Sequence, residues 1–261
     1  MISVVLLAAG QGTRMELLEG EPCKQLVRLP SNNSIIGRLF QQLAKQPEVG
    51  QIVVVLGCQA LSIEQELTGL LDAMHTLDVS QSKVSFVLNE DYASDTNAIS
   101  CLVGLDRLKQ LGWPGDRTLI VEADVLLGDA SVDQIVTDSL FGDAPLIAFT
   151  NGNRSEQKIK LRLKNGSSEA VAMGGSLLLP APGYHDKTMA GVWALCPAWT
   201  SWLQKELERL WQSQISPYYF HPIETMLARQ EGKLDTASLP DAFTANSREQ
   251  LRWAIEGLSE D

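Results

Sequence analysis

Basic residues, cysteines and long apolar runs are all scarce in this 261-residue sequence, and each shortage narrows the possible functions. Lys and Arg total 21 against 32 Asp and Glu, so the formal net charge of -11 makes a polyanion such as DNA a poor partner. No apolar run is long enough to cross a membrane, and the N-terminus lacks the basic region of a signal peptide. We therefore expect neither a nucleic-acid partner nor a membrane partner.

The few cysteines and histidines form no recognisable reactive set. The four cysteines are widely spaced and contain no CxxC pair or zinc pattern. Free thiols in apolar surroundings are common in a reducing compartment, so we expect a cytoplasmic protein. The sequence also lacks a Ser–His or Cys–His signature for covalent catalysis, and His185 and His221 are isolated.

Strand-like and helix-like segments alternate along the first half of the chain. Continuous apolar runs indicate buried strands at 3–7, 51–57, 83–89, 118–124 and 145–150. Helical spacing of apolar residues predicts helices at 34–46, 62–74 and 97–112. Apolar strands that alternate with helices are typical of a parallel sheet covered on both faces.

The second half has a different pattern. Charged and apolar residues alternate over 158–179 around Asn165-Gly166, which indicates a β-hairpin. Further helices are predicted at 197–214, 221–232 and 247–258, and a late strand at 233–239. We therefore expect one α/β domain over residues 1–261. Its mainly parallel, twisted sheet is flanked by helices, and antiparallel strands are added at the edge.

A glycine loop with its own cation follows the first predicted strand. Gly10 and Gly12 can turn tightly and present backbone N–H groups to an anion, although a simple strand-to-loop turn is the alternative. A P-loop would need Lys-Ser or Lys-Thr after a longer spacing, and a dinucleotide loop would need glycine at Met15. Arg14 and Lys24 can instead converge on a triphosphate.

The segment LLAAGQGTRM at 6–15, followed by PCKQL at 22–26, resembles the LAAGxGTRM and PKxL signature of the nucleotidyltransferases of GT-A-like fold. The second motif departs from the pattern, because Cys23 separates Pro22 from Lys24. The resemblance implies a nucleotide-diphospho-sugar transferase-like fold, with a nucleotide-binding half at about 1–150 and an acceptor-binding half at about 151–261. It implies catalytic roles for Arg14 and Lys24. It also implies nucleotide contacts from Leu7, Ala8, Ala9, Gly10, Gln11, Gly12, Thr13 and Arg14.

The same resemblance implies a Mg²⁺ site. Asp124 ends the fourth predicted strand, where the family carries an acidic metal ligand, and a turn or helix cap is its alternative role. The segment TANSREQLRWAIE resembles the VNxRxQLxxxE segment of sugar-phosphate uridylyltransferases, which makes Asn246 the second metal ligand, unless it merely precedes a helix cap. Glu122 lies two residues before Asp124, so it either faces the same site or points away.

The segment NEDYASDTNAISC at 89–101 resembles the NxxYxxxNNxYS region of phosphocholine and phosphonate cytidylyltransferases. Asn89, Tyr92, Asn97 and Ser100 keep this pattern, and Thr96 stands at the first of the paired asparagines. The resemblance favours CTP and adds Asn89, Thr96, Asn97 and Ser100 to the nucleotide site. Ordinary capping of the helix by Ser94, Asp95 or Thr96 is compatible with this role.

The implied reaction is a direct attack by a phosphate or phosphonate oxygen of a small acceptor on the α-phosphorus of the triphosphate. Such an oxygen is already ionised at neutral pH, so the reaction needs positioning and charge neutralisation rather than a base. Phosphocholine and an aminoethyl- or carboxyl-bearing phosphonate fit equally well. Candidate acceptor contacts, each with core packing or a solvated surface as its alternative role, are Glu122, Lys158, Lys160, Trp193, Tyr218 and Tyr219.

Three other functions stay open at this point. A sugar-phosphate nucleotidyltransferase would use another triphosphate with the same loop. A metal-dependent glycosyltransferase could use Glu122 and Asp124 as a DxD-like motif, but that class generally lacks the GxGTR loop. A nucleotide sensor with a retired active site would bind without turnover. The sequence also leaves a homodimer open.

Overall fold

The computed structural model describes residues 1–74, 83–95, 97–112, 116–150, 159–174, 182–213, 218–239 and 241–258. Thr96 and Lys158, both expected in the site, lie outside the described residues. None of the described helices has both the length and the apolarity that crossing a membrane requires. All four cysteines are free.

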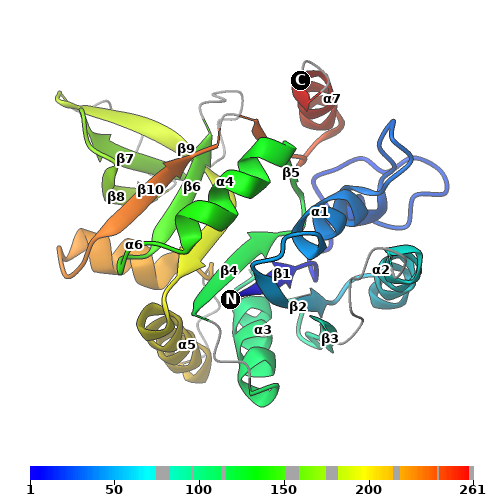
Figure 1. Ribbon diagram of the computed structural model, residues 1–261, viewed down its shortest axis with the longest axis horizontal. Helices are drawn as coiled ribbons and strands as arrows, with labels where there is room; N and C mark the ends of the chain where they lie inside the picture. Colours follow the sequence, from blue (N-terminus) through cyan, green and yellow to red (C-terminus); the bar gives the residue numbers. More distant parts are fainter. Residues whose placement is uncertain are drawn as a thin grey trace.

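A mixed sheet forms the centre of the molecule, with strand order β3-β2-β1-β4-β9-β6-β10-β8-β7, and a small second sheet pairs β11 with β5 (Figure 1). The strands are β1 Ile2–Leu7, β2 Val49–Leu56, β3 Val84–Leu88, β4 Arg117–Glu122, β5 Val125–Leu127, β6 Leu146–Thr150, β7 Lys160–Lys164, β8 Glu169–Gly174, β9 Tyr184–Leu195, β10 Leu234–Ser238 and β11 Ala242–Thr244. The helices are α1 Ile35–Ala44, α2 Ala60–Met74, α3 Ala98–Gln110, α4 Asp129–Ser139, α5 Pro197–Gln212, α6 His221–Ala228 and α7 Arg248–Leu258, with a 3-10 turn η1 at Lys24–Leu26.

The strand β1 is buried on both faces, which explains its unbroken apolar sequence. Val4 and Leu6 belong to an apolar cluster with α1, α2 and α4, whereas Val5 and Leu7 belong to a cluster with α3, α5 and α6. Successive side chains of a strand point to opposite faces, so two helical layers cover one strand. The parallel neighbours β2 and β4 then bring their carboxyl ends beside that of β1.

The prediction of a mainly parallel sheet holds for β3, β2, β1 and β4, and β10 is parallel to β6, but the remaining pairs are antiparallel. The segment at 145–150 forms a strand as predicted, but this strand, β6, does not pair with β4. Instead β9 lies between them and is antiparallel to both. Its buried apolar stretch from Met189 to Leu195 completes the hydrogen-bond ladder on each side. Antiparallel pairing therefore enters the middle of the sheet and not only its edge.

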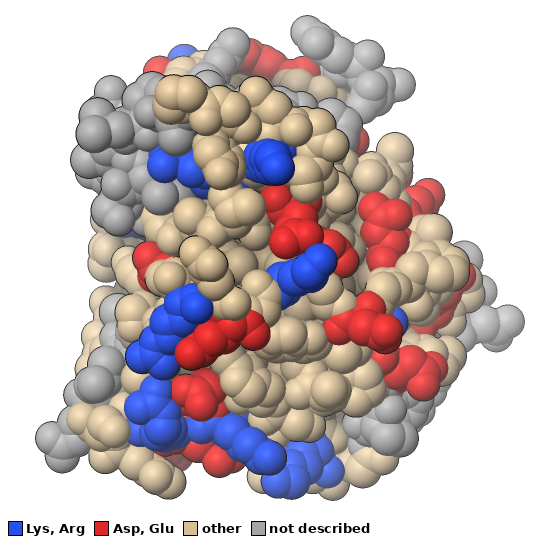
Figure 2. Space-filling model, turned by 90° about the vertical axis from the view of Figure 1, so that its left-hand side faces the viewer, with Lys and Arg blue, Asp and Glu red and all other residues tan. Residues whose placement is uncertain are grey.

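The predicted hairpin is present as β7 and β8, which pair antiparallel. Gly166 has a φ of 76°, a conformation that glycine adopts without strain, so the Asn-Gly turn forms as expected. Figure 2 faces this end of the molecule and shows Lys and Arg side chains intermixed with Asp and Glu. Arg162 forms two hydrogen bonds to the Asp186 carboxylate, at 2.8 and 2.9 Å, so this basic residue of the hairpin is paired within the protein.

Two glycines inside helices test how closely α3 packs on the sheet. A Cβ added at Gly104 would overlap Val5 Cγ1 and lie 2.9 Å from Val55 Cγ2, whereas one at Gly69 in α2 meets no heavy atom within 4 Å. We expect Gly104→Ala to lower the free energy of unfolding by about 1–3 kcal/mol through overpacking. Gly69→Ala should raise it by roughly 0.5–1 kcal/mol, because alanine favours helix. Urea unfolding of both variants measures this, and a neutral Gly104→Ala would contradict the close packing.

Candidate active site

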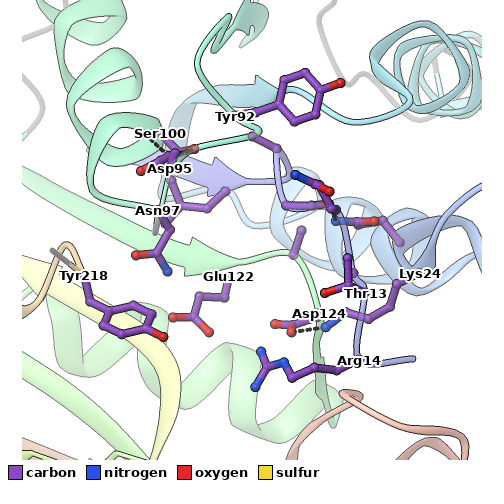
Figure 3. Close-up of a pocket in the computed structure, with 17 residues that line it drawn as sticks. Thr13, Arg14, Lys24, Tyr92, Asp95, Asn97, Ser100, Glu122, Asp124 and Tyr218 are labelled. Atoms are coloured by element: carbon purple, nitrogen blue, oxygen red, sulfur yellow. Dashed lines mark hydrogen bonds and ion pairs between the residues drawn. The ribbon is translucent and has the colours of Figure 1, made fainter. Parts of the chain in front are cut away.

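A pocket of about 760 Å³ opens where β1 and β4 end (Figure 3). The residues that line it come from the glycine loop, η1, the start of α3, the end of β4 and the segment before α6. They are Leu7, Ala9, Gly10, Gln11, Gly12, Thr13, Arg14, Lys24, Gln25, Tyr92, Asp95, Asn97, Ser100, Glu122, Ala123, Asp124 and Tyr218. Most of the residues predicted from the glycine motif therefore meet at one edge of the sheet. Ala8 does not line the pocket, because its side chain is fully buried in the core.

The glycine loop is shaped by contacts that only glycine permits. Gly12 has a φ of 66°, and a Cβ at this position would lie 2.7 Å from the Cβ of Lys24. The loop is held from the other side by Gln25, whose Nε2 donates a hydrogen bond of 2.9 Å to the carbonyl of Gly10. The backbone of the loop therefore lies directly against η1 and the side chain of Lys24.

The inserted Cys23 does not keep Lys24 away from the pocket. The Cys23 side chain is buried in the apolar core, and the next residue begins η1 with its side chain turned to the site. The ammonium of Lys24 is hydrogen-bonded and ion-paired to Asp124, and it donates a second hydrogen bond of 3.0 Å to Asn246 Oδ1. The structure thus joins three predicted site residues that are up to 222 positions apart.

Main-chain pairing brings the two predicted metal ligands together. Asp124 directly precedes β5, and Asn246 closely follows β11, which pairs antiparallel with β5. The amide of Ala245 extends this pairing with a hydrogen bond of 2.9 Å to the carbonyl of Asp124. The carboxylate and the amide oxygen are consequently presented from adjacent strand ends, and their relative position is fixed by backbone.

The donor atoms at this point suit a hard cation. The Asp124 carboxylate and Asn246 Oδ1 already contact one positive group, the Lys24 ammonium. Oxygen ligands of this kind are those that Mg²⁺ prefers, and Mg²⁺ commonly uses one or two protein ligands together with phosphate oxygens and water. The described residues contain no cluster of three or more His, Cys, Asp or Glu that could hold a metal. A magnesium site here would therefore rely on the substrate for its remaining ligands.

The two carboxyl groups at the end of β4 have opposite pKa shifts. Burial would raise the pKa of Asp124, but attraction to Lys24 and its hydrogen bond, with a contribution from Arg14, hold it below the usual value. Burial and the nearby charge of Asp124 raise the pKa of Glu122 to about 7. Tyr219 donates a hydrogen bond of 3.2 Å to Glu122 Oε1, and its own pKa is raised well above 10, mainly by burial. Asp124 therefore stays ionised, while Glu122 titrates near neutral pH.

The segment before α3 is organised around Asp95. Its carboxylate accepts hydrogen bonds from the amides of Ile99 and Ser100, the Ser100 hydroxyl and Asn89 Nδ2, at distances between 2.7 and 3.0 Å. Asn89 is 1% exposed and does not line the pocket. Asp95, one of the candidate caps, thus satisfies these amides at the start of the helix. Asn89 and Ser100 are bound mainly to each other and to Asp95.

Asn97 has a direct position in the pocket. It immediately precedes α3 and has a φ of 70°, in the left-handed region that asparagine tolerates better than most residues. Its Oδ1 accepts a hydrogen bond of 3.3 Å from the amide of Tyr219. Asn97 therefore links the start of α3 to the segment that carries Tyr218 and Tyr219.

The described candidate acceptor residues occupy three different positions. Glu122 and Tyr218 line the pocket, and Figure 3 shows Glu122 between Tyr218 and Asp124. Trp193 and Tyr219 are each 1% exposed and pack edge to face with ring centroids 6.0 Å apart, so they support the pocket from below. Lys160 does not line the pocket and donates a hydrogen bond of 3.3 Å to Thr188.

Sequence reasoning assigned no site role to four pocket residues, which are Gln25, Tyr92, Asp95 and Ala123. Gln25 was adjacent to Lys24 in the quoted motif, and that adjacency was the available signal. Asp95 was considered only as a helix cap, and Ala123 was passed over between two acidic residues. Gln25 and Asp95 hold the backbone of the site in place, so their hydrogen bonds depend on tertiary contacts that motif spacing does not reveal.

Residues 4–217 match the MobA-like NTP transferase domain. The chain belongs to this family. The match covers the glycine loop, Lys24 and Asp124 but ends before Asn246, which lies in the C-terminal segment. No curated protein sequence matches the chain.

Solved structures show the same fold at low sequence identity. CTP:phosphocholine cytidylyltransferase from Streptococcus pneumoniae is 14% identical, with a TM-score of 0.68 and 98% of each chain covered. The inositol-1-phosphate CTP transferase from T. maritima is 13% identical, with a TM-score of 0.68 over 99% of this chain and 96% of that one. A Bacillus anthracis protein assigned as a glucose-1-phosphate thymidylyltransferase is 14% identical, with a TM-score of 0.70 over 100% and 96%. The nucleotide-diphospho-sugar transferase-like α/β fold is therefore shared by enzymes that differ in base and acceptor.

The raised pKa of Glu122 predicts a specific dependence of stability on pH. In the folded protein Glu122 keeps its proton up to about pH 7, whereas in the unfolded chain it loses the proton near its usual pKa of 4.5. Deprotonation therefore favours the unfolded chain, and the free energy of unfolding falls as pH rises from 4.5 to about 7. We expect the free energy of unfolding of the wild type to fall, relative to that of Glu122→Gln, by on the order of 2–3 kcal/mol from pH 4.5 to 8. Chemical denaturation across this range measures it. The exposed Glu256→Gln variant is the control and should follow the wild type, and equal slopes for all three proteins would contradict the shift.

Proposed function

We propose that this protein is a cytidylyltransferase that transfers CMP from CTP to a small phosphate or phosphonate acceptor and releases pyrophosphate. The observation that carries the proposal is the convergence of Lys24, Asp124 and Asn246 beside a glycine loop that bears Arg14. A nucleotidyl transfer needs positive charge beside the phosphates, which Arg14 and Lys24 of this pocket would supply. Membership of an NTP transferase family supports the reaction class.

The triphosphate half of the site would use the glycine loop and its neighbours. Backbone N–H groups of the loop and the Arg14 guanidinium would bind the β- and γ-phosphates, since residues 10–14 line the pocket. Lys24 would stabilise negative charge at the α-phosphate, because its ammonium lies at the pocket wall with a stem fixed against Gly12. Asp124 and Asn246 would hold Mg²⁺, which when bound neutralises charge on the phosphate oxygens.

Catalysis would then rest on placement. The acceptor oxygen attacks the α-phosphorus, the bond to the bridging oxygen breaks, and pyrophosphate leaves with the electron pair. An ionised phosphate or phosphonate oxygen requires no general base, so the chain's own task is to align it with the α-phosphorus. Most of the barrier reduction would come from charges that are already in position before the reaction.

The preference for CTP and for an amine-bearing acceptor rests on the structural neighbours and on the surroundings of Glu122. Two neighbours of the same fold are named for CTP, although a third is named for a thymidylyl transfer. Among the described residues Glu122 has a hydrogen bond from Tyr219 but no ion pair, and it lies on the pocket wall near Tyr218. An ammonium group on the acceptor would give this carboxylate a partner and could pack on the exposed tyrosine ring.

The metal assignment predicts the effect of removing one carboxylate charge. We expect Asp124→Asn to lower magnesium-dependent turnover about a hundredfold or more, because the cation loses its charged ligand. Asp133→Asn, an exposed aspartate on α4 away from the pocket, is the matched control and should keep wild-type turnover. A folded Asp124→Asn variant with undiminished turnover would rule out the assignment.

The role given to Lys24 predicts a separation between binding and turnover. Lys24→Met should reduce kcat by about a hundredfold while the dissociation constant for CTP rises much less, because the charge acts on the transition state. Lys45→Met removes the same charge from an exposed position and should change neither value. Equal losses in binding and turnover would show that Lys24 is only a binding group.

The substrate assignment is tested by a matrix of four nucleoside triphosphates against phosphocholine, aminoethylphosphonate, carboxyl phosphonates and sugar phosphates, read as pyrophosphate release. We expect the highest kcat/KM with CTP and an amine-bearing acceptor, and a selective loss for that acceptor in Glu122→Gln. Preference for a sugar phosphate would replace the acceptor assignment. Tight binding of nucleotide without turnover would indicate a sensor, and turnover only with a nucleotide sugar would indicate a glycosyltransferase.

A further inference from the structure

We propose that Arg248 is a positioning residue that couples the segment after the glycine loop to the start of α7. In this role it fixes the position of the glycine loop relative to Asn246. The inference rests on the proposed function, since it assigns the two coupled elements to the nucleotide and the metal. It extends that function to a segment that lies beyond the residues matched by the family domain, which end at 217.

Arg248 makes two contacts to the segment that follows the glycine loop. Its Nε donates a hydrogen bond of 2.8 Å to the carbonyl of Glu16, and its guanidinium forms an ion pair with Glu21. The two side chains are 27% and 18% exposed, so the pair is partly shielded from water. An arginine bound to both a carbonyl and a carboxylate has a fixed orientation, which a single surface ion pair lacks.

Glu21 ties this ion pair into the turn that it closes. Its carboxylate accepts a hydrogen bond of 2.7 Å from the amide of Leu18, and its own amide donates to the Leu18 carbonyl at 3.1 Å. Arg248 therefore contacts a turn that is already closed on itself. A displacement of α7 would be transmitted to this turn as a unit.

An apolar cluster makes the same connection below the ion pair. Met15, the residue after Arg14, packs in a cluster with Leu251 and Ala254 of α7 and with Ala245. Figure 1 shows α7 beside the long segment between β1 and α1. The apolar contacts fix the distance between α7 and the segment after the glycine loop, and the contacts of Arg248 fix their relative orientation.

The start of α7 is equally closely bound to the predicted metal ligands. Asn246 lies two residues before Arg248, and its amide donates a hydrogen bond of 3.0 Å to Gln250 Oε1. Ser247 Oγ accepts from the amide of Gln250 at 3.2 Å, which caps the helix. Arg14 lies two residues before Glu16, which Arg248 contacts, and Asn246 lies two residues before Arg248 itself. A shift of about 1 Å between them can cost on the order of a hundredfold in rate.

The test compares Arg248→Met with Arg252→Met, an exposed arginine one turn further along the same helix. The readouts are the dissociation constant for Mg-CTP by calorimetry, the hydrogen exchange of amides 15–21, and the melting temperature. For Arg248→Met we expect an affinity about tenfold weaker and faster exchange in 15–21. Arg252→Met should match the wild type in affinity and in exchange. Arg248→Lys should recover part of the loss, because lysine keeps a positive charge opposite the Glu21 carboxylate.

A double-mutant cycle with Glu21→Gln identifies the contact through which Arg248 acts. If the ion pair carries the coupling, the double variant loses less than the sum of the two single losses. An Arg248→Met variant whose affinity and exchange equal those of Arg252→Met overturns the proposal. So does an affinity loss that merely follows a lower melting temperature, because that result indicates a general structural role.

Failure of the proposed function would look different. A wild-type protein that binds none of the four triphosphates contradicts the nucleotide assignment, while the exchange of 15–21 still reports whether Arg248 holds the loop. A wild type that binds Mg-CTP, together with unchanged exchange and affinity in Arg248→Met, contradicts only the positioning role.

Discussion

A buried ammonium that requires two oxygen acceptors is the interaction on which the site depends. Lys24 is 5% exposed, and a charge in such a position is tolerated only when it is paired and hydrogen-bonded. Its partners, Asp124 and Asn246, come from the middle and the end of the chain. The fold must therefore bring three distant segments to one point. The parallel strands, the β5–β11 pair and α7 together accomplish this.

This constraint joins the two halves of the chain. Residues 151–261 are predicted to form the acceptor-binding half, and within this range Asn246 contacts Lys24 while α7 packs on Met15. The pocket wall that contains Tyr218 has contributions from both halves as well, since Glu122 and Asn97 line the same pocket. The pocket lies where the two parts of the sequence interlock, and neither part contains a complete site.

The parts of the fold that could be predicted are those with strong local patterns. The strands β1, β2 and β4 each contain a continuous buried apolar run, and β3 is mostly apolar but only partly buried. The Asn165-Gly166 turn specifies its hairpin through backbone conformation. The strands β5 and β11 were missed because each has three residues and is stabilised only by its partner. The central place of β9 was missed for a related reason. Its position between β4 and β6 is decided by sheet pairing and leaves no periodic trace in the sequence.

The site, like the fold, could be predicted only where the sequence contains a strong local motif. Arg14, Lys24 and Asp124 follow from motif spacing at strand ends, and the structure brings them together at one pocket. The roles expected for Asn89 and Ser100 were harder to place, because their position in the motif does not show that Asp95 already binds both side chains. Trp193 and Tyr219 resembled ligand contacts in the sequence but are buried beneath the pocket. Motif spacing identifies which residues meet, whereas side-chain direction depends on the packed core.

In the proposed function, the glycine loop and the Asp124–Asn246 pair bind the two ends of one metal–nucleotide complex. A crystal structure with Mn²⁺ and a CTP analogue that cannot be cleaved between the α- and β-phosphates tests this most directly. The account predicts phosphates on the backbone of residues 10–14 and an anomalous peak for Mn²⁺ in contact with the oxygens of Asp124 and Asn246. A nucleotide bound elsewhere, or Mn²⁺ without contact to Asp124, would contradict it.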